Sequence, residues 1–232
     1  MEKVKAAVII LLKIIAGILG TAIFLGLFFG AAGSFYWPLG WIYIVYVTIC
    51  HSISAYLVWR KNPSLLLRRG SFGEGTKRWD KILLSIFGLS FYALVFVGAL
   101  DSGRYHWLPL PIWGWFIGAI LYIFNIYLIT WAMLVNPHFE KTVRIQHDQE
   151  HRVIDSGPYQ YVRHPGYTGT ILGFIFATPL LFCSGVAFVP AIFCAIALIV
   201  RTNLEDRLLL DELPGYKEYA EKVRFRLFPG IW

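Results

Sequence analysis

Charged residues are scarce in this sequence. Asp, Glu, Lys and Arg make up 15% of the 232 residues, whereas a soluble domain typically contains about 25%. Hydrophobic residues make up 57%, and they are grouped in long uncharged runs that alternate with short charged segments. A soluble core does not need so much apolar surface, so the pattern predicts an all-α, polytopic bundle of transmembrane helices.

Cysteine is also scarce. The three cysteines, Cys50, Cys183 and Cys194, all lie inside apolar runs, which argues against a disulfide framework and favours small buried residues. His147 and His151 have the i, i+4 spacing of metal ligands on a helix, but no cysteine accompanies them and a third ligand is not obvious. We therefore expect no metal site.

The basic residues are not gathered into one patch. The net charge is +7, but Lys and Arg fall at the ends of apolar runs, where they anchor to a cytoplasmic leaflet. We therefore expect membrane lipids as partners and no nucleic acid. The first apolar run lacks an obvious cleavage site followed by a soluble domain, so we expect a membrane span there and no cleavable signal peptide.

Six apolar runs are predicted to span the membrane: residues 14–33, 39–59, 82–100, 112–135, 167–183 and 186–200. Residues 183–185 form a tight turn between the last two. The sixth run covers only about 22 Å of a roughly 30 Å hydrocarbon core, so its helix is expected to continue past Arg201 towards Leu210. Nearly all Lys and Arg fall in the N-terminus, 60–81, 136–165 and the tail from Arg201, which predicts that both termini are cytoplasmic.

We expect two regions: a four-span membrane region at 1–135, and a region at 136–232 with a helical hairpin at 167–200 and an amphipathic cytoplasmic tail. Small residues recur every four positions in two spans, which favours close helix packing. The two stripes are Ala22, Gly26 and Gly30, and Gly169, Gly173 and Ala177.

Two cytoplasmic segments, 146–169 and 201–232, flank the hairpin and should meet at one membrane face. Pro165 fits the first turn of a helix, which places Arg163, His164 and Tyr167 near the helix N-terminus. That position suits an anionic ligand group, but simple interfacial anchoring explains the same residues equally well. Arg201 and Glu205 are four residues apart at the membrane boundary, so they form either an i, i+4 ion pair or a functional pair.

At these positions the sequence resembles the isoprenylcysteine carboxyl methyltransferase family of integral membrane enzymes. The resemblance covers about the last 95 residues, and its motifs occur in order and at approximately the expected spacing. They are Ser156-Gly157-Pro158-Tyr159, Arg163-His164-Pro165-Gly166-Tyr167 with Gly169, Arg201 with Glu205, Gly215-Tyr216 with Tyr219, and Arg226 with Pro229.

The resemblance implies S-adenosylmethionine as methyl donor, bound without the glycine-rich loop of a soluble nucleotide-binding domain. It implies catalytic roles for Arg201 and Glu205, with Arg201 holding the substrate. Many relatives carry a second glutamate where this chain has Asp206, a shorter acid. The cofactor contacts that it implies are Gln146, His151, Arg152, Val153, Ile154, Tyr159, His164, Pro165, Gly166, Tyr167 and Glu205.

The resemblance favours a lipid-like or prenylated acceptor, most simply a prenylcysteine α-carboxylate. Such an acceptor is already anionic and needs alignment more than a base. A phospholipid amine or a small thiol are alternatives, and an amine would favour a base such as His164. A transporter or structural membrane protein is a third hypothesis. Transporters usually place polar groups near the membrane midplane, whereas the main polar residues within these spans are only His51 and Asn125. The endoplasmic reticulum and a bacterial or archaeal plasma membrane both fit.

Overall fold

The computed structural model describes residues 2–69, 75–146 and 150–232, with the side chains of 2–10, 13 and 14 left aside. The described residues contain helices and no strand, as the sequence predicts. In chain order the elements are α1 (Glu2–Ala32), α2 (Pro38–Lys61), α3 (Pro63–Arg68), α4 (Arg78–Ala99), the π-helical η1 (Leu100–Tyr105), α5 (Trp113–Val135), the 3-10 helix η3 (Gly157–Gln160), α6 (Pro165–Gly169), the π-helical η4 (Thr170–Ile175), α7 (Ala177–Leu181), α8 (Phe188–Glu212) and α9 (Tyr216–Lys222).

Five helices are long and apolar enough to cross a membrane: α1, α2, α4 with η1, α5 and α8. The chain is therefore a multi-pass membrane protein. These five match the first four predicted spans and the last. The last helix continues to Glu212, as its short apolar run requires.

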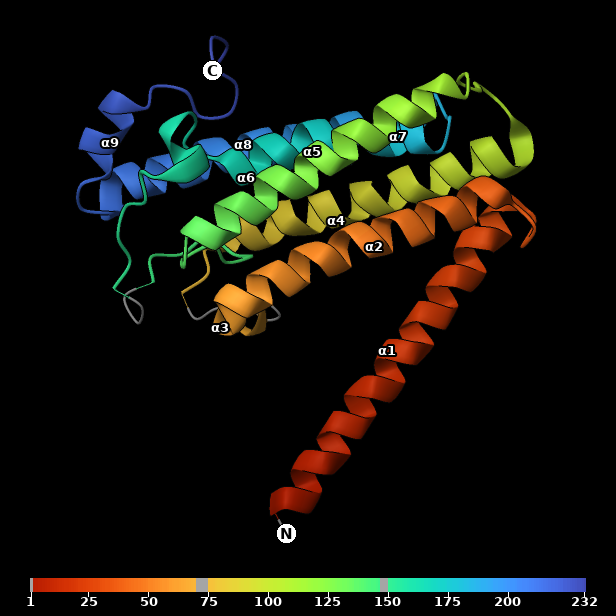
Figure 1. Ribbon diagram of the computed structural model, residues 1–232, viewed down its shortest axis with the longest axis horizontal. Helices are drawn as coiled ribbons and strands as arrows, with labels where there is room; N and C mark the ends of the chain where they lie inside the picture. The colour runs from red at the N-terminus through yellow and green to blue at the C-terminus, as the bar shows by residue number, and fades with distance from the viewer. Residues whose placement is uncertain (1, 70–74, 147–149) are drawn as a thin grey trace.

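The predicted span at 167–183 differs from a regular helix. It consists of α6, η4 and α7 in succession, and this broken segment runs alongside α5 for much of the bundle's length (Figure 1). Pro179 cannot donate a backbone hydrogen bond, and a π-helical stretch interrupts the α-helical pattern at Thr170. Such irregular backbone is tolerated at membrane depth because neighbouring helices bury it. Ile171, Ile175 and Leu181 are accordingly buried.

Three of the four basic segments share one end of the bundle. Residues 75–77 before α4, residues 136–146 and 150–164, and the tail beyond α8 all lie at this end (Figure 1). Lys77 Nζ lies 2.9 Å from Glu212 Oε1, which joins the first of these segments to the end of α8. Their common location agrees with the charge count, while the assignment of this end to the cytoplasm stays a prediction.

The core at the opposite half of the bundle is aromatic. Phe182 follows α7 and is fully buried, with its ring centroid 4.3 Å from that of Tyr43 on α2 and 5.9 Å from that of Phe28 on α1. Only the last turns of α1 join this core, since the rest of α1 diverges from the bundle (Figure 1). His51 on α2 makes an interhelical hydrogen bond, with Nε2 2.9 Å from Tyr122 Oη on α5.

The two small-residue stripes have different outcomes. The stripe on α6, η4 and α7 packs against α5, where Gly173 faces the backbone of Leu121 and Asn125. The stripe on α1 does not pack against any described segment, because a Cβ at Gly26 or Gly30 would meet nothing within 4 Å. The prediction of close packing is therefore confirmed for the first and wrong for the second within the described chain.

Candidate functional site

A cavity of about 500 Å³ opens at the basic end of the bundle. Its wall combines residues from the segments 136–146, here called the cavity loop, and 151–154 with residues of α4, α5, α6 and α8. One part of the wall is polar, and another is lined by the apolar side chains Leu84, Phe87, Ile129 and Leu198. Since these four residues lie within three of the membrane-spanning helices, the cavity joins a polar end to an apolar interior.

The cofactor and substrate contacts that the family resemblance implied all line this cavity. Residues 150–169 and α8 meet there, as the hairpin hypothesis requires, and the individual roles stay predictions. The shared wall contains Gln146, His151, Arg152, Val153, Ile154, Tyr159, His164, Pro165, Gly166, Tyr167, Arg201 and Glu205.

Arg201 is held by a partner that the sequence reasoning missed. Its Nε lies 2.7 Å from Asp80 Oδ1, and its Nη2 donates to the Lys141 carbonyl at 2.7 Å. The guanidinium also lies 5.2 Å from the centroid of the Tyr167 ring. Asp80 is fully buried in the first turn of α4. The sequence did offer a signal for this partner. Asp80 stands just before the apolar run 82–100, and an ionisable group at the membrane boundary needs a partner.

Glu205 does not form an ion pair with Arg201 among the described residues, although the two are one helical turn apart. Instead, Tyr167 Oη donates to Glu205 Oε2 at 2.5 Å. The Tyr167 ring stacks on His164 with an interplanar angle of 5°. The i, i+4 ion-pair interpretation is therefore wrong in this structure, and Glu205 is oriented by the broken span.

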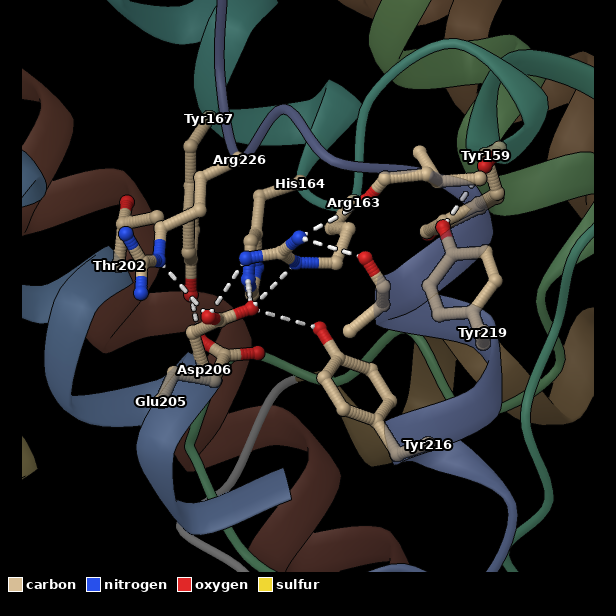
Figure 2. Close-up of polar contacts among 12 residues, drawn as sticks. Tyr159, Arg163, His164, Tyr167, Thr202, Glu205, Asp206, Tyr216, Tyr219 and Arg226 are labelled. Atoms are coloured by element: carbon tan, nitrogen blue, oxygen red, sulfur yellow. Dashed lines mark hydrogen bonds and ion pairs between the residues drawn. The ribbon is translucent and has the colours of Figure 1, made fainter. Parts of the chain in front are cut away.

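Asp206 lies at the centre of a buried polar network next to the cavity (Figure 2). Arg163 binds both of its oxygens, with Nε–Oδ1 and Nη2–Oδ2 distances of 2.8 and 2.9 Å. Arg226 Nε and Tyr216 Oη donate to the same carboxylate at 2.7 and 2.9 Å, and His164 Nε2 lies 3.2 Å from Oδ1. Asp206 itself is fully buried. Two long arginine side chains, Arg163 and Arg226, therefore reach the short Asp206 side chain.

The Asp206 network also fixes the protonation states of Arg163 and Tyr216. Burial works against the charge of Arg163, but the hydrogen bonds and charge of Asp206 raise its pKa above the ordinary value. Burial and the nearby Asp206 carboxylate also raise the pKa of Tyr216 well above its usual range. Arg163 is thus cationic and Tyr216 a neutral donor at pH 7.

The structure bears on two expectations about segment 163–167. The helix does begin at Pro165, and the N–H groups of Tyr167 and Thr168 donate to the His164 carbonyl at 3.0 and 3.1 Å. Two N–H groups at the helix start are therefore already paired, and binding of an anionic group there stays a prediction. Arg163 is buried on Asp206 and does not anchor the chain at the interface.

The tail helix α9 covers the site. Tyr216 and Tyr219 are buried, whereas Lys217 and Glu218 are exposed, so the predicted amphipathic helix is confirmed. Its apolar face packs onto protein, since Tyr219 Oη donates to the Tyr159 carbonyl at 2.7 Å. This contact and the bond from Tyr216 to Asp206 join the tail to both motif segments.

Three buried polar atoms on the cavity wall make no hydrogen bond within the described chain: His138 Nδ1, Thr142 Oγ1 and Gln146 Oε1. Gln146 Nε2 donates to the His138 carbonyl at 2.7 Å, which leaves the amide oxygen as an acceptor. His138 and Thr142 were not singled out by the sequence reasoning. Buried polar atoms without partners are costly, so a polar ligand would satisfy them.

The possible histidine metal site finds no support among the residues that the structure covers. None of the His, Cys, Asp and Glu side chains described there form a group of three or more suited to a metal ion. His151 lies on the cavity wall with its ring 4.7 Å from that of His138. The other member of the i, i+4 pair, His147, lies outside the described residues.

Fold and cavity together define a multi-pass helical membrane protein with a polar site at one end. Residues 116–211 match the sequence profile of the isoprenylcysteine carboxyl methyltransferase (ICMT) family. This match confirms the family resemblance for that part of the chain. It includes most of α5, the broken span and all but the last residue of α8, whereas Arg69, Asp80 and Arg226 lie outside it.

Two curated relatives are from rice, Oryza sativa subsp. indica and Oryza sativa subsp. japonica. Each carries the name probable protein-S-isoprenylcysteine O-methyltransferase, and each is 28% identical to this chain over 92 residues. The matched region covers 37% of this chain and 45% of each relative. The chain therefore spans less than half the length of these relatives.

Proposed function

We propose that this protein is an S-adenosylmethionine-dependent membrane methyltransferase that acts on the carboxylate of a prenylated cysteine or a similar lipophilic acceptor. The observation that carries the proposal is the cavity, whose polar wall is continuous with an apolar wall inside the bundle. A lipid chain could occupy the apolar part while the polar head of the same molecule lies near Arg201 and Glu205.

The residues present fit the donor. S-adenosylmethionine carries amines, hydroxyls, a carboxylate and a sulfonium, and when bound it would supply an electrophilic methyl group. The Gln146 oxygen is an acceptor for one of its N–H groups, and Thr142 offers a hydroxyl that can donate or accept. Glu205 faces the same cavity and would complement the positive charge of the sulfonium.

The chain's own residues would align the acceptor and exclude water. Tyr167 holds Glu205, and Asp80 holds Arg201, so both charged groups have fixed positions before any ligand binds. Preorganised charges of this kind contribute more in a site closed off from water. Because a carboxylate acceptor is already anionic, the reaction needs no general base.

An amine acceptor would need a base, and His164 is the candidate. Its Nε2 lies 3.2 Å from Asp206, a carboxylate that already binds two arginines. Because Nε2 is already engaged by this carboxylate, only Nδ1 would remain to take a proton from an amine. A carboxylate acceptor needs no such base and is the simpler proposal.

Equilibrium binding of S-adenosylmethionine to the purified protein tests the donor. A methyl-transfer assay with a prenylcysteine analogue, a phosphatidylethanolamine and a small thiol in parallel tests the acceptor. We expect donor binding and turnover of the prenylcysteine, with a strong loss in Arg201→Ala. A folded protein that binds no donor would refute both enzyme hypotheses and favour the transporter or structural alternative. Undiminished turnover by Arg201→Ala would refute the role of Arg201.

A further inference from the structure

The arginines on the cavity wall differ in what they bind. Arg163 is paired with Asp206, Arg201 with Asp80, and Arg144 with Glu140 at 2.9 Å. Arg152 is exposed to solvent. The fifth, Arg69, follows α3 and is half-buried, and the structure shows it paired with no carboxylate of the described residues.

Arg69 is held in place by neutral groups. Its Nη1 donates to the Phe139 carbonyl at 2.9 Å, and its Cζ lies 5.0 Å from the centroid of the Phe139 ring. Within the described chain, Nε and Nη2 make no hydrogen bond. These two nitrogens form one edge of the guanidinium, and such an edge matches the two oxygens of a carboxylate.

The position of Arg69 is central to the site. Burial lowers its pKa below the ordinary value, and the positive charge of Arg201 lowers it further, while Tyr167 and Tyr159 act in the opposite direction. Arg69 therefore lies within electrostatic range of three residues from the motif segments. A bound anion would relieve both the burial of its charge and the repulsion from Arg201.

Arg201 offers less for the same task. Its Nε and Nη2 are both engaged, by Asp80 and by the Lys141 carbonyl, so only Nη1 makes no hydrogen bond among the described groups. A two-oxygen contact through the Nε–Nη2 edge would require Arg201 to leave Asp80. Arg69 presents that edge without breaking any contact.

We propose that Arg69 is a carboxylate-binding residue of this cavity, in addition to Arg201, and grips a ligand carboxylate through Nε and Nη2. The inference rests on the proposed methyltransferase function. It adds a binding residue from the N-terminal region, outside the matched residues 116–211. Two ligands of that reaction carry a carboxylate: the methionine part of the donor and the acceptor cysteine. The chemistry is the same, and binding measurements distinguish the two sources.

The test compares purified wild type, Arg69→Gln and Arg69→Lys. Arg60→Gln is the matched control, since Arg60 is exposed at the same end of the bundle and does not line the cavity. Binding is measured with S-adenosylmethionine and its decarboxylated analogue. The KM is measured with an N-acetylated farnesylcysteine, and inhibition with the corresponding carboxamide. Thermal unfolding confirms that each variant is folded.

If Arg69 grips the donor, Arg69→Gln weakens S-adenosylmethionine binding on the order of 10- to 100-fold and leaves binding of the decarboxylated analogue unchanged. If it grips the acceptor, the KM for farnesylcysteine rises by a similar factor and inhibition by the carboxamide is unchanged. Arg69→Lys should recover part of either loss. A folded Arg69→Gln that matches Arg60→Gln in all four measurements overturns the inference alone. A wild type that binds no donor overturns the proposed function, and the inference with it.

Discussion

Asp80 and Arg201 join two membrane-spanning helices at the wall of the cavity. Asp80 lies in the first turn of α4 and Arg201 in the second half of α8, and the Oδ1–Nε distance is 2.7 Å. The second oxygen of Asp80 accepts a hydrogen bond from the Val143 N–H at 2.8 Å. The same carboxylate therefore holds the cavity loop and positions the arginine, so loss of Asp80 should affect stability and activity together.

A double-mutant cycle on this pair is the first prediction. Asp80→Asn leaves the buried Arg201 charge without its partner, and a broken buried pair typically costs about 3–5 kcal/mol. Arg201→Gln leaves Asp80 in the same condition. We expect the double variant to be more stable than the sum of the two losses implies, with a coupling of about 1–3 kcal/mol in unfolding free energy. Additive losses within about 0.5 kcal/mol would show that the pair is not coupled.

The second prediction concerns Asp206. Asp206→Ala removes the carboxylate that Arg163 and Arg226 share, which leaves the buried Arg163 guanidinium without a counter-charge. We expect a loss of about 3–5 kcal/mol in unfolding free energy, measured in detergent. Asp211→Ala is the control, because Asp211 lies on the same helix but is exposed, and it should cost less than about 0.5 kcal/mol. Equal effects of the two substitutions would contradict a structural role for the Asp206 network.

Hydropathy predicted the helices well because a membrane imposes a minimum apolar length. It did not predict that the fifth segment is broken, because length and composition carry no information on π-helical backbone. The break depends on how Gly169 and Gly173 fit against α5. The charge count predicted which loops share an end, since every span crosses from one side to the other.

Motif residues predicted the wall of the cavity, but sequence spacing did not predict the ion pairs. Arg201 and Glu205 are one turn apart on α8, yet Arg201 binds Asp80 and Glu205 binds Tyr167. Long-range pairs depend on how the helices rotate against one another, and a local i, i+4 preference is worth only about 0.2–0.5 kcal/mol. The Asp80 carboxylate on α4 and the Tyr167 hydroxyl on α6 outweigh it.

Two glycines provide the third prediction. Gly173→Ala should destabilise the bundle by about 1–3 kcal/mol, because a methyl group there would collide with the α5 backbone at Leu121 and Asn125. Gly26→Ala is matched in chemistry, and its Cβ would meet nothing within 4 Å in this structure. It should leave the thermal midpoint unchanged or slightly higher, since alanine favours helix more than glycine does. A larger loss at Gly26 than at Gly173 would place the tight helix contact on α1 instead.

The fourth prediction concerns pH and His138, which lies in the cavity loop. Burial lowers the pKa of His138 below its ordinary value of about 6.5. The unfolded chain then binds more protons than the folded one as pH falls through 6.5, so this histidine's contribution to stability is present above that pH and is lost below it.

Between pH 7.5 and 5.5, wild type should lose more in its thermal midpoint than His138→Gln. His106→Asn, at an exposed turn at the other end of the bundle, should keep the wild-type slope. Parallel slopes for wild type and His138→Gln would show that His138 is not the group responsible. A steeper wild-type slope would place part of the acid sensitivity in the cavity wall, where a protonated His138 would add positive charge near Arg152 and Arg68.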